Sequence, residues 1–477
     1  MPFLIVSAVL LAILVTVLIV RTVLFVPRMP QVGELEKIAV DTDRAAGELS
    51  ALIACKTVSN QDRSLEDESE FAKLERILPK IFPIVFKKCE FEKVGDRGLL
   101  LRWSGKSQTS PTVLMAHYDV VAADGSQWSY PPFSPEIHDG FLYGRGTLDT
   151  KLTVAAMLHA AERLMERDFT PLHDIYFAFG GDEEVSGHGA SEIVALFEKR
   201  GIYPALVLDE GGAVVKGAFP GVRRSAALIG IAEKGMANIA YTVRGGGGHA
   251  STPKGHTPVT RLARAATRAM RKPFPYRMTL PTKLLLDRVM RHSTFGYRLI
   301  FANLWFFSPI IRLITRDGGD LAALLRTTVA FTEMHGAEGM NVIPAEATLM
   351  SNSRILPGET PNAVRDRLAG LVDDPEVEVS VLSAQPPSRL SLVDCPEYAR
   401  VESTASEVWP NAIASPYLML ACSDSRHWGR LSDRVYRFSP LEFVGDERAT
   451  IHGNDERIAL SSIDKAVEFF YRFIRKS

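Results

Sequence analysis

The first stretch of the chain is apolar at almost every position. Residues 2–20 contain no charged side chain, and after Arg21 the apolar run resumes over residues 22–26. A helix of this length, rising about 1.5 Å per residue, can cross a hydrocarbon core of roughly 30 Å. We therefore expect residues 1–28 to form an uncleaved, single-pass membrane anchor. A cleaved signal peptide is the alternative, but the apolar core is long for one and no A-x-A-like site follows it.

The charges beside this segment bear on its orientation. Arg21, Arg28 and Lys37 all follow the apolar run, and no Lys or Arg precedes it. Under the positive-inside rule, this asymmetry would leave the body of the chain in the cytoplasm.

Beyond the anchor, strand-like and helix-like periods alternate. Residues 33–54 and 153–167 repeat apolar side chains at helical spacing, which predicts two amphipathic helices. Three short apolar runs predict buried strands, at residues 112–121, 174–181 and 205–212. Strands that alternate with helices are typical of an α/β fold, here a mixed-sheet α/β sandwich.

The period changes near residue 230. Residues 235–251 and 346–358 alternate apolar and polar side chains, which predicts antiparallel strands. We expect a second, smaller α+β domain over residues 230–385, inserted into the larger domain. The larger domain would then consist of residues 33–229 and 386–477, closed by a C-terminal helix.

Residues 297–314 form another strongly apolar segment. The segment is short for a second membrane span and contains Pro309 and Arg312. One interpretation is a buried helix or a subunit interface. The other is a wall for an apolar ligand or a patch that contacts a membrane surface.

Composition narrows the functional classes. The 477 residues are 46% hydrophobic and 23% charged, with a formal net charge of -1. This balance gives no electrostatic reason to expect a nucleic-acid partner. The four cysteines are widely scattered and form no C-x-x-C pair, which excludes a cysteine zinc site of the usual spacing and offers no disulfide framework.

Ionisable residues follow each predicted buried strand. They are His117 and Asp119 after the first strand, Asp182, Glu183 and Glu184 after the second, and Asp209 and Glu210 after the third. Asp149 lies between a glycine-containing turn and the helix predicted at residues 153–167. In α/β sheets, ligands bind beyond the carboxyl ends of the strands, so these groups should meet at one edge.

Carboxylates gathered in this way repel one another unless cations neutralise them. A lone His or Asp at a strand end is more often a capped or solvated residue, but the joint occurrence favours one or two divalent metal ions. A set of His, Asp and Glu ligands without Cys suits zinc and also accepts cobalt or manganese.

Short motifs extend this pattern along the chain. MAHYDVV, GRGTLDTK, GGDEEVSG and LDEGG carry the groups above, and RGGGGHAST, NVIPAEATLMSNSRILPGET, SDSRHW and IHGNDERI follow them. From about residue 45 onward, the chain resembles the di-zinc exopeptidases that include carboxypeptidase S, aminoacylase and succinyl-diaminopimelate desuccinylase. It is most similar to the carboxypeptidase S branch, which also contains secreted N-acyl amino acid hydrolases.

The resemblance implies a site with two Zn²⁺ ions. Asp149 would bridge them, followed in this family by a cis peptide, here Asp149–Thr150. The remaining metal ligands implied are His117 and Asp209 on one ion, and Glu184 and His452 on the other. Asp119 would orient the His117 ring and Glu183 would be the general base, while Asp182 would be an outer residue or a turn residue.

The smaller domain is implied to be a lid and a dimerisation domain, which allows a homodimer. His249 would stabilise the oxyanion, often from the partner subunit in this family. Asn341 and Arg354 would hold the carboxylate of the substrate, a role that suits the bidentate guanidinium. Arg426 is a weaker candidate for the same pocket, with a salt bridge between domains as its alternative.

The resulting prediction is a membrane-anchored zinc hydrolase that cleaves an amide bond next to a free α-carboxylate, in the manner of a carboxypeptidase. An N-acyl amino acid amidohydrolase is the alternative, so the substrate would be a small peptide or an N-acyl amino acid. A more distant alternative is a non-catalytic membrane-attached binding protein, which a lost ligand or a lost Glu183 would favour.

Overall fold

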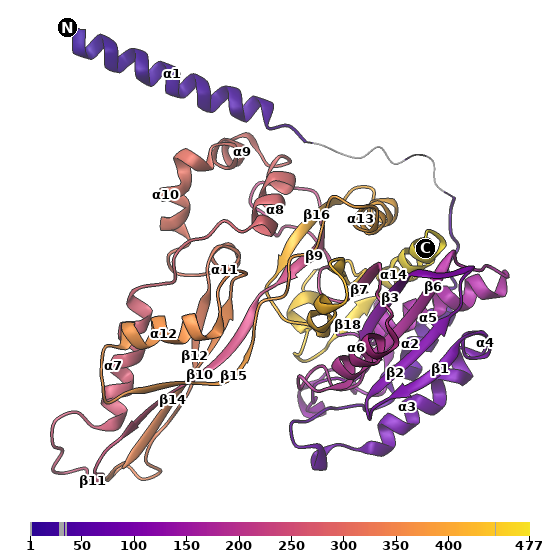
Figure 1. The fold of residues 1–477 in the computed structure, drawn as a ribbon, viewed down its shortest axis with the longest axis horizontal. Helices are drawn as coiled ribbons and strands as arrows, with labels where there is room; N and C mark the ends of the chain where they lie inside the picture. Colours follow the sequence, from indigo (N-terminus) through magenta and orange to yellow (C-terminus); the bar gives the residue numbers. More distant parts are fainter. Residues whose placement is uncertain (1, 28–32, 34–35, 444) are drawn as a thin grey trace.

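A computed structural model describes residues 2–27, 33, 36–443 and 445–477. Helix α1 (Pro2–Leu24) projects from the body, and only Thr22 in it is buried. The rest of the chain forms two lobes, a larger one built around a wide sheet and a smaller one around a narrow sheet (Figure 1).

The wide sheet lies in the larger lobe. Its strands run in the order β1 (Glu90–Val94), β2 (Gly98–Trp103), β6 (His173–Gly180), β3 (Ser107–His117), β7 (Leu206–Asp209), β17 (Val435–Arg437), β9 (Ala226–Glu233) and β16 (Ile413–Met419), with β8 (Val214–Val215) paired to β9. Strands β6, β3, β7 and β17 are mutually parallel, whereas β1, β2 and β6 pair antiparallel. The prediction of a mixed-sheet α/β fold is confirmed.

Helices cover both faces of this sheet. On one face, α2 (Thr42–Ile53), α5 (Lys151–Glu166) and α14 (Leu460–Arg475) share a core with buried strand residues such as Leu114 and Phe177. On the other face, α6 (Gly189–Arg200) and the 3-10 segment η3 (Asp424–Arg430) pack on Val113 and Tyr176. Strand β3 is therefore buried on both sides, which explains its continuous apolar run.

The narrow sheet is antiparallel, in the order β12 (Thr328–His335), β14 (Glu346–Ile355), β10 (Gly235–Arg244) and β15 (Glu378–Gln385). Its alternation is that of a sheet with one covered face. Helices α7 (Pro258–Arg271) and α12 (Pro361–Val372) cover that face and pack on Ile239 and Leu349. A single residue, Lys234, separates β9 from β10 and joins the two sheets at this point.

A helical segment separates α7 from β12. It contains α8 (Leu280–Met290), α9 (Phe295–Ala302), α10 (Leu304–Ile314) and α11 (Asp320–Leu325). The apolar segment expected at residues 297–314 is broken at Asn303, where α9 and α10 meet at 108°. Side chains of α8, α9 and α11 form a separate apolar core against Leu228 and Leu418 of the wide sheet.

Shorter elements complete the described chain. They are α3 (Glu68–Ile81), α4 (Pro83–Lys88), α13 (Pro396–Val408), β4 (Glu136–His138), β5 (Phe141–Tyr143), β11 (Gly248–His249), β13 (Val342–Ile343), β18 (Arg457–Ala459), η1 (Arg63–Leu65), η2 (Gly125–Gln127) and η4 (Glu447–Thr450). Strand β18 pairs with β5 and thereby brings the C-terminal part of the chain to the loop that carries Asp149.

Candidate active site

The carboxyl end of β3 positions the first histidine. His117 is the last residue of the strand and is 2% exposed. Its Nδ1 lies 3.0 Å from the carbonyl oxygen of Asp119 and 3.3 Å from Asp119 Oδ1. Its Nε2 lies 2.9 Å from Asp149 Oδ1 and 3.4 Å from Glu210 Oε1. If Nδ1–H donates to Asp119, the lone pair of Nε2 faces carboxylate oxygens, an arrangement that requires a proton or a cation between them.

Asp119 is fully buried and joins three segments. Its Oδ1 accepts from the backbone N–H of Glu183 at 3.2 Å, and its Oδ2 accepts from that of Glu184 at 3.1 Å. The hydroxyl of Ser59 donates to Oδ2 at 2.7 Å. Asp119 therefore fixes both the ring of His117 and the turn that carries the two glutamates.

The three acids at residues 182–184 have different surroundings. Asp182 accepts from the backbone N–H groups of His188 at 2.8 Å and Gly189 at 3.0 Å, at the start of α6. It is thus a turn residue that satisfies free N–H groups at a helix N-terminus. Glu183 and Glu184 both line the central cavity described below.

Asp149 lies between the two histidines. Its Oδ1 faces His117, and its Oδ2 lies 3.0 Å from Nε2 of His452. Burial alone would raise the pKa of Asp149, but the hydrogen bonds from His117 and His452 outweigh it and hold that pKa well below its usual range. The peptide bond between Asp149 and Thr150 is cis.

The loop before Asp149 is held by a residue that the sequence analysis missed. Glu456 is fully buried, and its Oε2 lies 2.5 Å from NH1 of Arg145. Its Oε1 accepts from the backbone N–H groups of Gly146 at 3.1 Å and Leu148 at 2.8 Å. Because Glu456 is four residues from His452 in the motif IHGNDERI, its place in that motif was the available signal.

Glu184 and His452 form the second half of the cluster. Nε2 of His452 lies 3.1 Å from Glu184 Oε2, and the hydrogen bonds that His452 donates to the carboxylates of Asp149 and Glu184 raise its pKa to about 10. The other oxygen of Glu184, Oε1, is buried and has no hydrogen-bond partner among the described residues. A buried carboxylate oxygen without a donor is costly, and a metal ion at this position would satisfy it.

The structure places Glu210, and not Asp209, beside His117. Asp209 is the last residue of β7 and points to η3, where its Oδ2 accepts from the backbone N–H of Ser425 at 2.9 Å. Glu210 lies in the central cavity, and burial raises its pKa to about 8. Adjacent residues at a strand end point to opposite sides, so only one of these two acids can face the cluster. The expectation for Asp209 is corrected accordingly.

Together these groups include two sets whose ligand atoms lie within 4.8 Å of one another, His117 with Asp149 and Glu184, and His117 with Glu183 and Glu210. Burial raises the pKa of Glu183 well above its usual value, although His117 opposes this. The donor set of imidazole nitrogens and carboxylate oxygens fits divalent metal ions of the zinc type.

Cationic side chains face the same space from two directions. A cavity of about 500 Å³ is lined by Asp149, Glu183, Glu184 and Glu210, by Arg354 of β14, and by Arg426 of η3. NH1 of Arg354 lies 3.4 Å from Sγ of Cys422, and among the described residues no carboxylate forms an ion pair with it. Arg426 lies 3.7 Å from Asp424, a partner in its own segment and not across the two lobes.

Asp424 is a further buried acid that the sequence analysis missed. Within the described part of the chain its Oδ1 has no hydrogen-bond partner, and burial raises the pKa of Asp424 to about 7, although Arg426 opposes this. It lies in the motif SDSRHW, in which only Arg426 had been singled out.

His249 and Asn341 are not brought to the cluster. His249 belongs to β11, which pairs with β13, and the backbone N–H of Ala250 donates to the carbonyl oxygen of Asn341 at 2.9 Å. Both residues are exposed, neither lines the cavity, and β11 lies at the far tip of the smaller lobe (Figure 1). Asn341 lies in a turn before β13 and not in a long strand.

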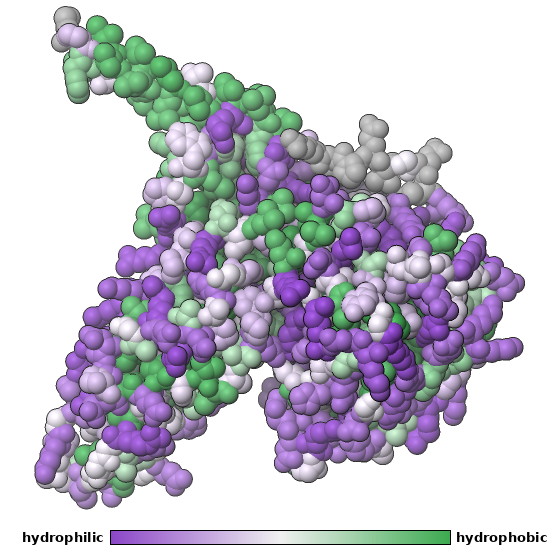
Figure 2. All heavy atoms as spheres, in the orientation of Figure 1, coloured by the Kyte–Doolittle hydropathy of each residue, from purple (hydrophilic) through white to green (hydrophobic). Residues whose placement is uncertain are grey.

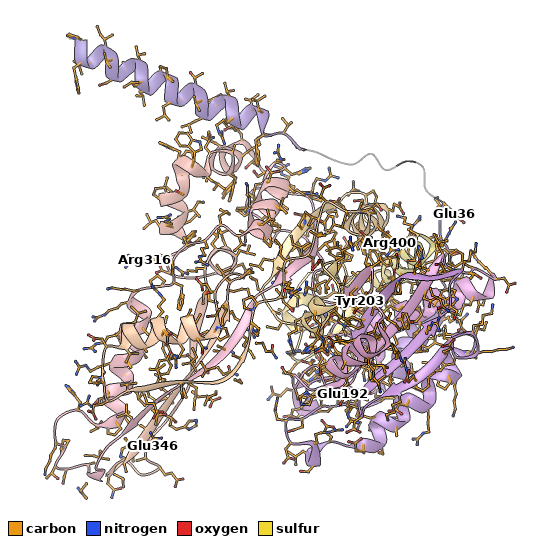
Figure 3. All side chains as sticks on the ribbon, viewed as in Figure 1. Glu36, Glu192, Tyr203, Arg316, Glu346 and Arg400 are labelled. Atoms are coloured by element: carbon orange, nitrogen blue, oxygen red, sulfur yellow. The ribbon has the colours of Figure 1, made fainter. Side chains whose placement is uncertain are left out.

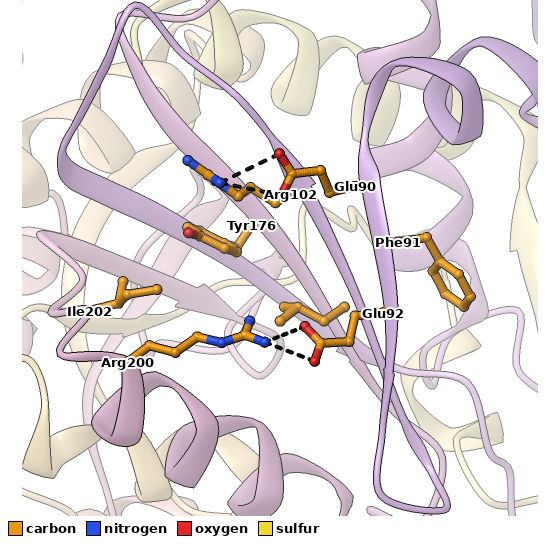
Figure 4. A pocket seen from close by; sticks show the side chains of 8 residues that line it. Glu90, Phe91, Glu92, Arg102, Tyr176, Arg200 and Ile202 are labelled. Carbon is orange, nitrogen blue, oxygen red and sulfur yellow. Dashed lines mark hydrogen bonds and ion pairs between the residues drawn. The ribbon is translucent and has the colours of Figure 1, made fainter.

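Another surface pocket lies far from these residues. Figure 4 shows it between β1, β2, β6 and the end of α6, with Arg102 paired to Glu90 and Arg200 paired to Glu92. Its charged side chains already neutralise one another, and none of the residues predicted for the site lines it.

Comparison with known proteins identifies relatives of the whole chain. Residues 113–476 match the model of peptidase family M20/M25/M40. A probable carboxypeptidase S-like protein of Dictyostelium discoideum is 33% identical over 96% of this chain and 91% of its own length. An N-fatty-acyl-amino acid synthase/hydrolase of Xenopus tropicalis is 34% identical over 90% of this chain and 85% of its own length.

Solved structures share the fold at low sequence identity. An M20 family metallo-carboxypeptidase from Sulfolobus solfataricus superposes with a TM-score of 0.67 at 16% identity, covering 90% of this chain and 98% of that one. Human carnosine dipeptidase 1 gives a TM-score of 0.65 at 16% identity, covering 91% and 96%. The chain belongs to peptidase family M20/M25/M40.

Proposed function

We propose that this protein is a dinuclear metal-dependent amidohydrolase that cleaves an amide bond next to a free carboxylate. The observation that carries the proposal is that Asp149, Glu184, Glu210 and His452 line one cavity that arginines also line, while His117 contacts Asp149 and Glu210. Among the relatives are a probable carboxypeptidase and N-fatty-acyl-amino acid hydrolases.

The ligand assignment follows the geometry. Asp149 would bridge two ions, since its two oxygens face different histidines. His117 and Glu210 would complete one shell, and Glu184 and His452 the other. Zinc suits these donors best, and cobalt or manganese would also fit. When bound, the metals would polarise the scissile carbonyl and lower the pKa of the attacking water.

Glu183 would act as the general base. It lies within the same cluster as His117 and Glu210, and neither shell assigned above includes it. Its carboxylate would accept the proton of the attacking water and return it to the nitrogen of the leaving amine. Asp119 would act through His117, by holding its Nδ1–H and thereby the ring orientation.

Arg354 would bind the carboxylate of the substrate. It reaches the cavity from the narrow sheet, opposite the acidic cluster of the wide sheet, and among the described residues it has no carboxylate partner of its own. A guanidinium in such a place suits a bidentate carboxylate. Arg426 would assist, although Asp424 engages part of its charge.

A smaller cavity favours an apolar acyl group on the other side of the amide. Its volume is about 150 Å³, and it adjoins the central cavity through shared residues such as Tyr417 and Leu420. Its further walls include Phe219, Leu228 and Leu324. We therefore rank N-acyl amino acids with long apolar acyl chains above small polar peptides as substrates, with dipeptides as the second candidate.

A substrate panel tests this function. The proposal expects turnover of an N-acyl amino acid, little turnover of its α-carboxamide, and higher kcat/KM for a long acyl chain than for acetyl. Equal rates on the free acid and the amide would refute the carboxylate pocket. Faster cleavage of dipeptides than of every N-acyl amino acid would reverse the ranking of the two substrate classes.

His249 and Asn341 would act across a homodimer. Both are exposed at a tip distant from the cavity of their own chain, a placement that suits contact with a partner's site. Mixing Glu183→Gln protein with His249→Ala protein would then restore part of the activity, because a mixed dimer contains one intact site. Absence of any recovery in a mixture shown to exchange subunits would refute the crossing histidine.

Helix α1 would be a retained single-pass anchor. It is the one described helix that is long and apolar enough by itself to cross a membrane, and by composition alone a signal sequence passes the same test. Contacts favour retention, because the side chain of Asn303 is buried and donates to the carbonyl oxygen of Leu18 at 3.1 Å. Cleavage after α1 would leave this buried amide without that partner.

A further inference from the structure

The end of α1 is seated in a polar joint on the body. Nδ2 of Asn303, at the corner between α9 and α10, donates to Leu18 O at 3.1 Å and contacts Thr22 Oγ1 at 3.2 Å. The guanidinium of Arg21 donates to the carbonyl oxygen of Ala302 at 3.2 and 3.3 Å. Thr22 is fully buried in this joint. The orientation of α1 relative to α10 is therefore fixed by side-chain contacts and not by the linker alone.

A second contact strengthens the joint. The guanidinium of Arg291 lies 4.3 Å from the ring centre of Phe25 and donates to the carbonyl oxygen of Val26 at 3.3 Å. Phe25 itself packs against the apolar core formed by α8, α9 and α11. The chain is thus bound to the body from Leu18 to Val26.

Helix α10 presents an apolar face to the outside. Trp305 is 56% exposed, Phe306 42%, Ile310 47%, Leu313 69% and Ile314 65%. Phe306, Ile310 and Ile314 are four residues apart, and Trp305 and Leu313 are eight apart, so all five lie on one side of the helix. On the opposite face, Ile311 is the single buried residue of the helix. Exposed apolar patches of this kind mark surfaces that contact another phase or another protein.

The charges within α9 and α10 are basic, while Asp287 pairs with Arg291 at 2.8 Å and Asp317 follows Arg316. Residues 291–316 contain the arginines Arg291, Arg298, Arg312 and Arg316 and no acidic residue. Arg316, just beyond α10, points away from the body (Figure 3). A helix with an apolar face and basic neighbours is typical of segments that lie in the interface of anionic membranes.

The position of the joint along α1 sets its depth. Sixteen residues of α1, Pro2 to Val17, precede Leu18. They span about 24 Å at 1.5 Å per residue, against a hydrocarbon core of roughly 30 Å. The joint therefore falls near the level where α1 leaves the core, and α10 begins at that joint. Figure 2 shows the apolar surface of α1 reaching the body on this side.

We propose that α10 lies in the boundary between headgroups and acyl chains of the membrane that α1 crosses, so that the body docks on lipid through this helix. The proposal rests on α1 being a retained span. Trp305, Phe306, Ile310, Leu313 and Ile314 enter the acyl region, and Arg312 and Arg316 contact anionic headgroups. The catalytic lobes are thereby held in one orientation on the membrane.

The fluorescence of Trp305 can report the contact between α10 and lipid. Of its five tryptophans, Trp305 is 56% exposed, whereas Trp103, Trp128, Trp409 and Trp428 are at most 8% exposed. Full-length protein is reconstituted into vesicles of phosphatidylcholine with phosphatidylglycerol, with and without brominated acyl chains. Bromine quenches only tryptophans that reach the acyl region. The proposal expects a quenched component that disappears in Trp305→Phe.

Two variants separate docking from anchoring. Leu313→Glu with Ile314→Glu should remove most of the quenching, whereas Leu65→Glu, at a leucine of η1 that is 71% exposed, should leave it unchanged. Resistance to alkaline carbonate, measured on the same vesicles, reports α1 independently. Carbonate extraction of the wild type would overturn the retained span.

If the protein resists carbonate extraction but Trp305 is not quenched, the docking of α10 is overturned and the retained span is not. A different outcome would assign the face to a second copy of the chain. In that case Trp305 would not be quenched by brominated lipid, and in detergent it would be protected from aqueous iodide in a species of twice the monomer mass.

Discussion

Replacing Glu456 by Gln tests how the loop that carries Asp149 is held. The carboxylate of Glu456 neutralises Arg145 at 2.5 Å and accepts from three backbone N–H groups of the loop, those of Gly146, Leu148 and Asp149, at 3.1, 2.8 and 3.3 Å. The side chains of Arg145 and Glu456 are 2% and 0% exposed. Glutamine preserves the shape and one acceptor oxygen, but it removes the charge and points an amide toward the guanidinium.

The expected loss is large because Arg145 stays buried. Its remaining polar contact is NH2 to the carbonyl oxygen of Gly453 at 3.0 Å, with the Trp128 ring 5.2 Å away. Removing one partner of a buried pair costs about 3–5 kcal/mol. Because the loop orients Asp149, metal affinity should also fall, by roughly 10–100-fold, the effect of losing a group that orients a ligand.

Urea unfolding followed by near-ultraviolet circular dichroism measures the stability, and titration with zinc measures the affinity. Asp446→Asn is a matched control, because Asp446 also pairs with an arginine at 2.5 Å but is 76% exposed. That change should cost about 0–1 kcal/mol. Adding Arg145→Met to Glu456→Gln should cost less than the sum of the single changes. If Glu456→Gln is no more destabilising than Asp446→Asn, the loop is not held in this way.

Three further predictions concern the chemistry. Glu210→Gln should lower the metal content of the purified protein and Asp209→Asn should not; the reverse result would restore the sequence-based assignment. Glu183→Gln should keep the metal and lower kcat by roughly 10²–10⁴-fold, whereas Glu184→Gln should lose metal. Elemental analysis and turnover measured on the same samples distinguish the two variants. Arg354→Ala should reduce kcat/KM for a free-acid substrate by a factor that corresponds to about 2–4 kcal/mol, while residual turnover of the matching amide stays unchanged. An equal loss on both substrates would show that Arg354 does not bind the carboxylate.

Local periodicity predicted the elements that carry most of the site. Strand β3 and helix α5 are each recognisable from a stretch of sequence alone; β3 ends at His117, and α5 begins two residues after Asp149. The side on which Asp209 and Glu210 point depends on where β7 ends, and sequence patterns place strand ends only to within a few residues. Because of this single-residue ambiguity, the sequence-based prediction named Asp209 as the ligand where the structure has Glu210 beside His117.

Other features depend on contacts between distant segments. The role of Glu456 exists only because β18 pairs with β5 beside the Asp149 loop. The apolar segment at residues 297–314 reads as one element, yet Asn303 bends it, because its side chain bonds the end of α1 about 280 residues earlier. The positions of His249 and Asn341 are set by the smaller lobe, and their distance from the cavity in one chain was not predictable from their motifs.

The metal content of the purified full-length protein tests the central claim most directly. The account predicts close to two divalent ions per chain by elemental analysis, loss of activity after prolonged chelation, and recovery when zinc or cobalt is added. Full activity in protein shown by the same analysis to be free of metal would contradict it.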